Sequence, residues 1–132
     1  MTTRRAQCSC GQLSATCVGE PVRVSVCHCL ECKRRTGSAF GYAGRWAQKD
    51  VTLAGEASHF VRTGDEGTQG THSFCPSCGV TIFWTNSNIP GFVMVAAGAF
   101  ADLSFPPPQV SVYDDSRRYP WIELNTQPLE KY

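Results

Sequence analysis

Residues 26–40 read VCHCLECKRRTGSAF. The cysteines of this stretch can bind a metal ion, and the source of any further ligand decides how the rest of the chain must fold around them. Cys27, Cys29 and Cys32 fall within six positions, and three positive charges follow them directly. A zinc ion that only stabilises structure is held by four protein ligands, whereas a catalytic zinc keeps three protein ligands and an exchangeable fourth position. A fourth cysteine from elsewhere would therefore make this group structural, and its absence would favour an enzyme.

The eight cysteines of the chain divide into three clusters and one isolated residue. The clusters are CSCG at residues 8–11, CHCLEC at residues 27–32 and CPSCG at residues 75–79. Cysteines two or three residues apart beside a glycine can turn their sulfur atoms toward one metal ion. We therefore predict two Zn²⁺ ions per chain. The expected ligands are Cys8, Cys10, Cys75 and Cys78 for a closed structural zinc, and Cys27, Cys29 and Cys32 for a catalytic zinc with an open position.

An alternative division pairs Cys29 and Cys32 with Cys75 and Cys78, as in a zinc ribbon. It leaves three cysteines without a site, and the segment between the pairs is much longer than the roughly 15–20 residues of that pattern. We therefore favour the division into four and three. The isolated Cys17 lies in an apolar pattern and is expected to be a small core residue.

The remaining sequence predicts short strands, with a helical turn only at residues 29–35. Apolar residues alternate with polar ones in the strands, and Gly, Asn, Asp and Pro separate them. The expected strands are residues 12–18, 22–29, 39–46, 51–53, 58–63, 80–85, 92–100, 109–113 and 121–124. FPPPQ at 105–109 should lead into an edge strand. We predict a mainly β fold of short, curved antiparallel sheets, a single domain over residues 1–132 with its core at about 6–125.

Strand alternation sorts the side chains of residues 22–29 onto two faces. Val22, Val24 and Val26 are expected to enter the core, while the cysteines project from the opposite face. His28 then faces away from the cysteines, so we expect a hydrogen-bonded or partly exposed ring rather than a metal ligand.

Composition narrows the function further. Hydrophobic residues make up 42% and charged residues 17% of the chain, as in a soluble globular protein. No apolar run is long enough to cross a membrane, and no apolar segment of a secretory signal follows the basic N-terminus. We therefore expect a cytoplasmic location, where eight cysteines indicate metal binding rather than disulfides. The net charge is +1, and two zinc ions on seven thiolates would move it to −2, which argues against nucleic acid as a partner.

Several stretches together resemble the glutathione-dependent formaldehyde-activating enzyme family, which includes the centromere protein V domain. They are CSCG at 8–11, CHCLECKRRTGSAF at 27–40, FCPSCGVTIFW at 74–84, and AAGAFAD at 96–102 with PWIEL at 120–124. The resemblance implies a β-tent fold, zinc at the seven cysteines divided as above, and formation or cleavage of S-(hydroxymethyl)glutathione, a carbon–sulfur lyase reaction. Family members often carry a histidine where this chain has Ser111, so a role of that histidine does not transfer.

On this basis we expect a small thiol such as glutathione to bind at the open zinc position as a thiolate and to add to a small aldehyde such as formaldehyde. Arg34 and Arg35 would hold the carboxylates of the thiol by charge-assisted hydrogen bonds. Ser38 would offer its hydroxyl, and Phe40 and Trp84 would wall the pocket.

A non-catalytic, zinc-stabilised binding or adaptor domain is the alternative, because the centromeric relative serves in a protein assembly. A zinc nucleobase deaminase is disfavoured, since no H-x-E motif accompanies the cysteines. A thiol–disulfide oxidoreductase is disfavoured because neither CxxC is expected to open a helix after a strand. The sequence does not determine the oligomeric state.

Overall fold

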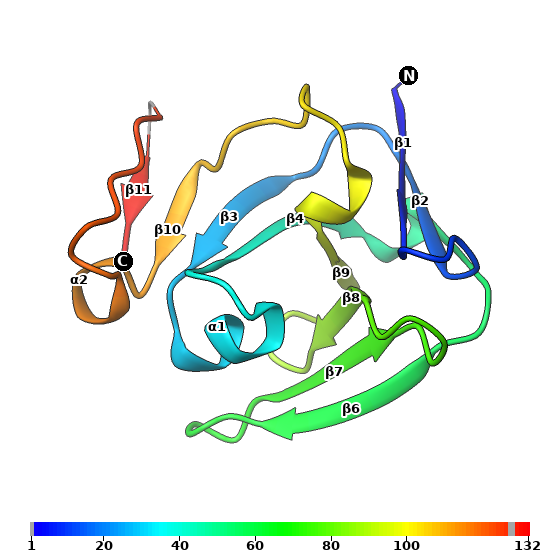
Figure 1. Cartoon of the computed structure of the whole chain (residues 1–132), viewed down its shortest axis with the longest axis horizontal. Coiled ribbons are helices and arrows are strands. Elements are labelled where there is room, and N and C mark those ends of the chain that lie inside the picture. Colours follow the sequence, from blue (N-terminus) through cyan, green and yellow to red (C-terminus); the bar gives the residue numbers. More distant parts are fainter. Residues whose placement is uncertain (1, 127–128) are drawn as a thin grey trace.

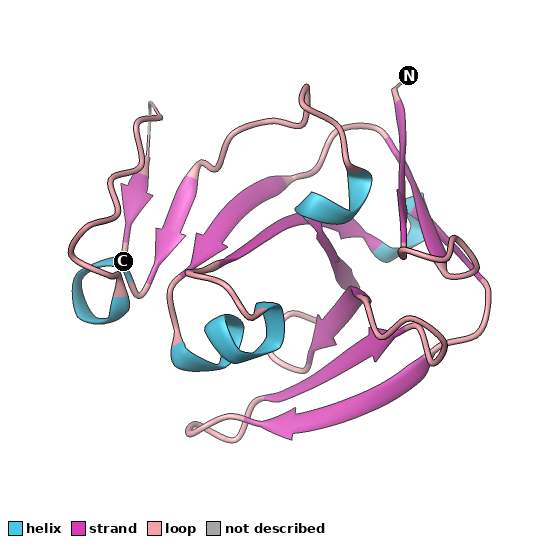
Figure 2. Cartoon of the chain, in the orientation of Figure 1, coloured by secondary structure: helices cyan, strands magenta, loops and turns pink. Residues whose placement is uncertain are grey.

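The computed structural model describes residues 2–126 and 129–132, and short strands dominate it (Figure 1; Figure 2). Within these residues the strands are β1 (Thr3–Gln7), β2 (Ser14–Val18), β3 (Arg23–Cys27), β4 (Gly41–Ala47), β5 (Val51–Ala54), β6 (Ser58–Thr63), β7 (Gln69–Phe74), β8 (Thr81–Asn86), β9 (Phe92–Ala96), β10 (Val110–Val112) and β11 (Glu130–Lys131). The helices are α1 (Leu30–Thr36), α2 (Asp114–Arg117) and the 3-10 turns η1 (Gln48–Asp50) and η2 (Ala97–Phe100). The predicted mainly β fold is confirmed.

The strands form two sheets. A small antiparallel sheet has the order β1-β2-β5, and the larger sheet has the order β11-β10-β3-β4-β9-β8-β7-β6. From β3 to β6 the larger sheet is antiparallel, as predicted, but β10 pairs in parallel with both β3 and β11. The segment after FPPPQ is therefore not the outermost strand, because the short β11 pairs with its free side.

The larger sheet curls around the short helix α1, which lies on its concave side with β3 and β4 on one side and β6 and β7 on the other (Figure 1). The helix begins after Cys29, whose side chain accepts a hydrogen bond from the backbone N–H of Cys32. It ends at Gly37, whose φ of 63° is a left-handed conformation that glycine adopts without strain. The helical turn predicted at residues 29–35 is confirmed. No helix within the described residues has the length and apolar character needed to span a membrane.

The main hydrophobic core draws on both sheets. Trp46 is 1% exposed, and its ring centroid lies 5.5 Å from that of Phe100 and 6.3 Å from that of Phe105. Gly44 makes room for this ring, since a Cβ there would lie 2.7 Å from a Trp46 ring carbon. Cys17 is fully buried, and burial raises the pKa of its thiol to about 12. This confirms the prediction that Cys17 is a core residue.

The strand predicted over residues 22–29 is shorter than expected, so Val22 and Cys29 lie outside it. β3 spans Arg23–Cys27, so Val24 and Val26 are buried as predicted, while Val22 precedes the strand and is 62% exposed. Cys29 lies beyond the end of the strand, at the N-cap of α1. The prediction that Cys29 shares a strand face with Cys27 is therefore wrong.

Other strand predictions also need correction. β1, β7 and β11 were not predicted; β7 reads QGTHSF, too polar to show apolar alternation, and pairing with β6 and β8 makes it a strand. Residues 121–124 form no strand, because Ile122 donates to the carbonyl of Tyr119 in a turn. Residues 92–100 form a strand only as far as Ala96 and then wind into η2.

Candidate metal centres

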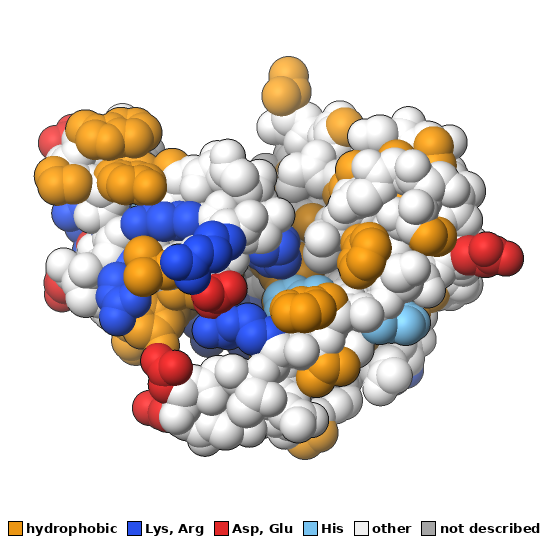
Figure 3. Space-filling model, turned by 60° about the horizontal axis from the view of Figure 1, so that its bottom comes forward, with side chains coloured by type: hydrophobic (Ala, Val, Ile, Leu, Met, Phe, Trp, Pro, Cys, Tyr) orange, Lys and Arg blue, Asp and Glu red, His pale blue; other side chains and the backbone are white. Residues whose placement is uncertain are grey.

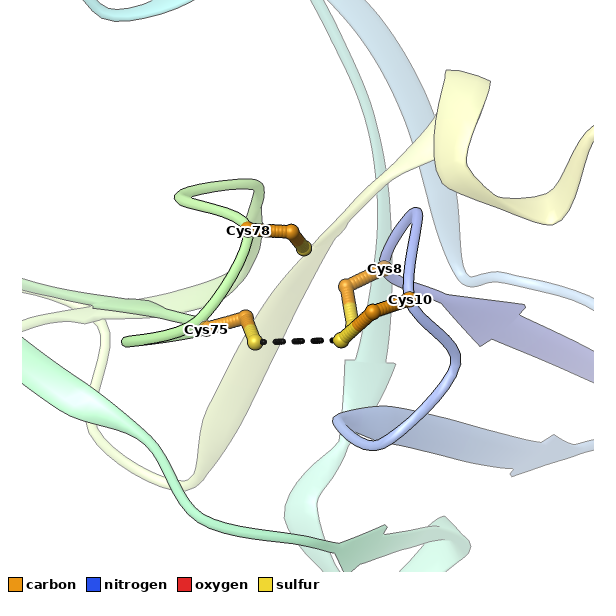
Figure 4. A group of neighbouring side chains, drawn as sticks. All are labelled: Cys8, Cys10, Cys75 and Cys78. Carbon is orange, nitrogen blue, oxygen red and sulfur yellow. Dashed lines mark hydrogen bonds between the residues drawn. The ribbon is translucent and has the colours of Figure 1, made fainter.

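The fold brings Cys8 and Cys10, between β1 and β2, face to face with Cys75 and Cys78, between β7 and β8 (Figure 4). All four sulfur atoms lie within 4.8 Å of one another. The Cys10 sulfur lies 3.6 Å from that of Cys8 and 3.6 Å from that of Cys75. Tetrahedral zinc, with Zn–S near 2.3 Å, places its sulfur ligands about 3.8 Å apart. The spacing therefore fits a closed four-thiolate zinc site.

Tight turns hold these sulfur atoms in place. The backbone N–H of Cys8 donates to the Leu13 carbonyl at 3.0 Å, and the Leu13 N–H donates to the Cys8 sulfur at 3.3 Å. In the second turn the Cys75 N–H donates to the Val80 carbonyl at 3.0 Å. Gly79 takes a φ of 81°, which residues with a side chain rarely adopt. Backbone hydrogen bonds thus preorganise both pairs of sulfur atoms.

Sequence reasoning missed Gln12, which supports the four-cysteine group. Its side-chain N–H donates to the Cys75 sulfur at 3.0 Å and to the Glu56 carbonyl at 2.7 Å, while its Oε1 accepts from the Glu56 N–H at 2.9 Å. The hydrogen bond from Gln12 lowers the pKa of Cys75 to about 6, which favours the metal-binding thiolate. The sequence gives no signal for Gln12 beyond its place beside CSCG.

Cys27, Cys29 and Cys32 form the second group, with all three sulfur atoms within 4.8 Å of one another. Cys27 ends β3, Cys29 caps α1, and Cys32 lies in the first turn of the helix. A strand-to-helix turn, rather than one strand face, therefore brings them together. Hydrogen bonds from the Cys27 and Cys32 thiols lower the pKa of Cys29, and contact with Cys29 raises the pKa of Cys27. Cys29 is therefore the thiolate that its neighbours stabilise, and the closeness of the three sulfur atoms fits a shared metal ion.

Cys29 and Cys32 also form a CxxC pair that opens a helix directly after a strand, contrary to the sequence prediction. This is the setting preferred by thiol–disulfide oxidoreductases. Disulfide exchange needs two cysteines, however, whereas a metal site with an open position uses three ligands. The close third sulfur of Cys27 therefore fits metal binding better.

Within the described residues no fourth Cys, His, Asp or Glu side chain joins this group. His28, which stands between two of the cysteines in sequence, is fully buried and turns away. Its Nε2 lies 3.0 Å from the Ser111 hydroxyl, which donates to Asp114 Oδ2 at 2.6 Å, and Arg118 Nε donates to Asp114 Oδ1 at 3.3 Å. Of the two states predicted for the ring, hydrogen-bonded or partly exposed, the structure shows the first, so among the described residues His28 offers no fourth ligand to a metal at the triad.

A cavity of about 560 Å³ opens beside the triad. Cys29 and Cys32 line it from the helix side, and aromatic rings including Phe60 and Trp84 line it from β6 and β8. Lys and Arg side chains gather around a hollow on this face of the molecule, with an acidic side chain among them (Figure 3). A second cavity of about 710 Å³ adjoins the first, and Arg35 lines both.

Three arginines and one glutamate line the triad cavity, so its charge is positive. Arg34 forms an ion pair with Glu31 at 2.7 Å, and Arg62 reaches the same carboxylate from β6 at 3.6 Å. The guanidinium carbon of Arg35 lies 4.1 Å from the centre of the Trp84 ring. Arg34, Arg35 and Trp84, predicted as substrate contacts, are thus at the cavity.

The other predicted contacts lie elsewhere. Phe40 lines the second cavity, and its ring centroid is 5.6 Å from that of His28. Ser38 is exposed at the end of α1 and lines neither cavity. Lys33 also points away, because its Nζ lies 3.9 Å from the centre of the Tyr119 ring.

Strands β6 and β7 add cavity residues that the sequence analysis did not single out. Arg62 and Phe60 come from β6, and His72 comes from β7. The His72 ring stacks on Trp84 with 5.7 Å between centroids and 28° between planes. Burial lowers the pKa of His72, and the nearby Arg35 lowers it further, so this ring is neutral at pH 7. His72 reaches the cavity because it lies on β7, a strand that the sequence did not predict.

A family model described as "Glutathione-dependent formaldehyde-activating enzyme" matches residues 3–116. The chain belongs to this family. Both cysteine groups and the cavity residues named above lie within the matched range.

Among solved structures, the crystal structure of a Rhodobacter sphaeroides protein, a structural genomics target, aligns with a TM-score of 0.55 and 19% sequence identity. The alignment covers 72% of this chain and 85% of that protein. At this identity the likeness supports a shared fold alone. A search of curated proteins gives no significant match.

Proposed function

We propose that this chain forms and cleaves the carbon–sulfur bond of thiol–aldehyde adducts, with S-(hydroxymethyl)glutathione as the adduct that its family favours. The observation that carries the proposal is the group of Cys27, Cys29 and Cys32, which gains no fourth ligand from the described residues and borders a cavity. A catalytic metal needs both an open position and a route to it, and the cavity would provide that route.

Zinc bound to the triad would hold the substrate sulfur as a thiolate, which is the nucleophilic form. The cavity residues would hold the thiol and the aldehyde close together, which is the main requirement of a reaction between two small molecules. Three thiolates are soft, strongly donating ligands, so the triad suits capture of a further sulfur ligand better than activation of water.

The positive charge of the cavity supports an anionic thiol as substrate. Arg34 and Arg62 share the single carboxylate of Glu31, and Arg35 has no acidic partner among the described residues. A thiol that carries carboxylates, as glutathione does, would gain charge-assisted hydrogen bonds from Arg34 at the exposed edge of the cavity. The exposed Phe60 ring at the cavity would pack against the apolar part of the bound molecule.

We also propose that Cys8, Cys10, Cys75 and Cys78 hold a structural zinc. These residues join the loop that follows β1 of the small sheet to the turn between β7 and β8 of the larger sheet. A metal here would therefore tie the two sheets together, and its four thiolate ligands would leave no position for a substrate.

NMR exchange spectroscopy on a mixture of glutathione and formaldehyde tests the reaction. We expect the zinc-loaded protein to speed exchange between free glutathione and its hydroxymethyl adduct. Cys27→Ala should abolish this effect, because it removes one ligand of the triad. A wild-type protein that holds two zinc ions and gives no rate enhancement would rule out this lyase activity and favour the alternative, a non-catalytic zinc-stabilised binding domain.

A further inference from the structure

Arg35 stands apart from the other basic residues of the cavity in its position and its partners. We propose that it is a catalytic residue, which stabilises the negative charge on the aldehyde oxygen while the carbon–sulfur bond forms or breaks. This inference rests on the proposed function and assigns Arg35 to the reacting atoms rather than to a remote carboxylate of the thiol.

Arg35 and Cys32 meet at Gly41, the first residue of β4. A Cβ on Gly41 would lie 2.9 Å from Arg35 Nη2, 3.2 Å from Cys32 Cβ and 3.4 Å from Cys32 Sγ. The lack of a side chain at Gly41 therefore allows the guanidinium to approach the triad. Arg35 and Cys32 also line the same cavity, so a reactant at the open side of the triad lies within reach of this cation.

The Trp84 ring fixes the guanidinium in place. The guanidinium carbon is 4.1 Å from the ring centre, and Trp84 itself is only 8% exposed. His72 stacks on the same indole and restrains it further. A guanidinium packed against an aromatic ring keeps its in-plane N–H groups free to donate to an oxygen atom. The donor is thus held before substrate arrives, as electrostatic catalysis requires.

Among the described residues, no carboxylate balances the charge of Arg35. Arg34 is paired with Glu31 at 2.7 Å, whereas Arg35 forms no ion pair among the described residues. Lys33, the third cation of the run, lies over the Tyr119 ring. A cation without a carboxylate partner in a partly buried site stabilises a developing anion more than a cation whose charge a carboxylate already balances.

The reaction balances as follows. The thiolate sulfur forms a bond to the aldehyde carbon, and the π electron pair of the C=O bond moves onto oxygen. Arg35 donates hydrogen bonds to that oxygen and keeps its own protons, because arginine stays protonated in proteins. Water then gives the oxygen a proton, which replaces the proton that the thiol lost to solvent. Cleavage of the adduct follows the same path in reverse.

A comparison of two thiols, one with carboxylates and one without, distinguishes a role at the aldehyde oxygen from a contact with a substrate carboxylate. We would measure formaldehyde exchange by NMR with glutathione and with 2-mercaptoethanol, which has no carboxylate, for the wild type, Arg35→Met, Arg35→Lys and Arg34→Met. Arg35→Met should lower kcat about 100-fold with both thiols, as for loss of one oxyanion donor, and Arg35→Lys should restore part of it. Arg34→Met should mainly raise KM for glutathione.

Binding and zinc content separate catalysis from folding. Arg35→Met should retain two zinc ions by native mass spectrometry and bind 2-mercaptoethanol alone, by calorimetry, as tightly as the wild type does. A loss confined to glutathione, or equal kcat in the wild type and both Arg35 variants, would overturn the role at the aldehyde oxygen. An inactive wild type would overturn the proposed function itself, so the two failures are distinguishable.

Discussion

His28 Nε2 lies 3.0 Å from the hydroxyl oxygen of Ser111, and that hydroxyl donates to Asp114 Oδ2 at 2.6 Å. All three side chains are buried. Because His28 stands between Cys27 and Cys29 in the chain, this network anchors the triad segment to Ser111 of β10. None of the three residues lines the triad cavity.

Ser111→Ala should therefore destabilise the protein without removing a metal ligand. The change leaves His28 and Asp114 buried without their bridging hydroxyl, which costs about 1–3 kcal/mol of unfolding free energy. Urea unfolding followed by circular dichroism measures this loss. The control is Ser38→Ala at an exposed site, where we expect a change within about 0.5 kcal/mol. Equal stability of the two variants would contradict the account of this network.

The two cysteine groups should respond differently to the loss of one ligand. Cys27→Ala should lose one zinc and stay folded, because the triad lies within one local turn. Cys75→Ala should lose the other zinc and lower the melting temperature strongly, since its group joins two sheets. Native mass spectrometry and thermal unfolding give both readouts, and equal effects from the two variants would undo the division into four and three.

Gly55→Ala should be far more damaging than Gly67→Ala, although both glycines have positive φ values of 96° and 83°. A Cβ on Gly55 would lie 1.9 Å from the carbonyl oxygen of Gln12, whereas a Cβ on Gly67 meets no atom within 4 Å. We expect losses of about 2–4 kcal/mol and about 1 kcal/mol, respectively. Chemical denaturation of the two variants measures the difference, and similar losses would show that the contact with Gln12 is not tight.

Cys17 predicts a pH dependence of stability. Its folded pKa is raised to about 12 by burial, above the value of about 8.5 for a free thiol, so the folded protein keeps a proton that the unfolded chain loses. The contribution of the Cys17 thiol to the unfolding free energy is complete below about pH 8.5. It declines as pH rises, by at most about 1.4 kcal/mol per pH unit.

The unfolding free energy of the wild type should therefore fall more steeply between about pH 8.5 and 10.5 than that of Cys17→Ala. Urea unfolding at several pH values gives the two slopes, and comparison of the two proteins cancels the titration of all other groups. Parallel slopes would mean that the Cys17 thiol is not shielded from water.

Local sequence patterns predicted much of this fold, because buried positions show a recognisable pattern of apolar residues. The alternation around Val24 and Val26 and the isolation of Cys17 both predicted core positions. The parallel pairing of β10 with β3 has no such pattern, because it depends on how the chain returns across the sheet from residue 101 to residue 109. β7 escaped prediction because most of its residues are polar, so it lacks the apolar alternation of a core strand; of these polar residues, His72 lines the cavity.

The candidate site shows the same division. Cysteine spacing predicted which sulfur atoms would gather, since short turns set that geometry. The cavity contacts of Arg62 and His72 depend on the curl of the sheet, which brings β6 and β7 opposite α1 (Figure 1). Likewise, nothing in the sequence distinguishes Arg35 from Arg34. The difference comes from the room left at Gly41 and from Trp84, which is distant in the chain.

The most direct test of the central claim is a crystal structure of the zinc-loaded protein soaked with glutathione, with zinc located by anomalous scattering. We predict one zinc on Cys8, Cys10, Cys75 and Cys78, and a second on Cys27, Cys29 and Cys32 with the glutathione sulfur as its fourth ligand. A protein side chain in that fourth position, or a triad that holds no metal when zinc is supplied, would contradict the account.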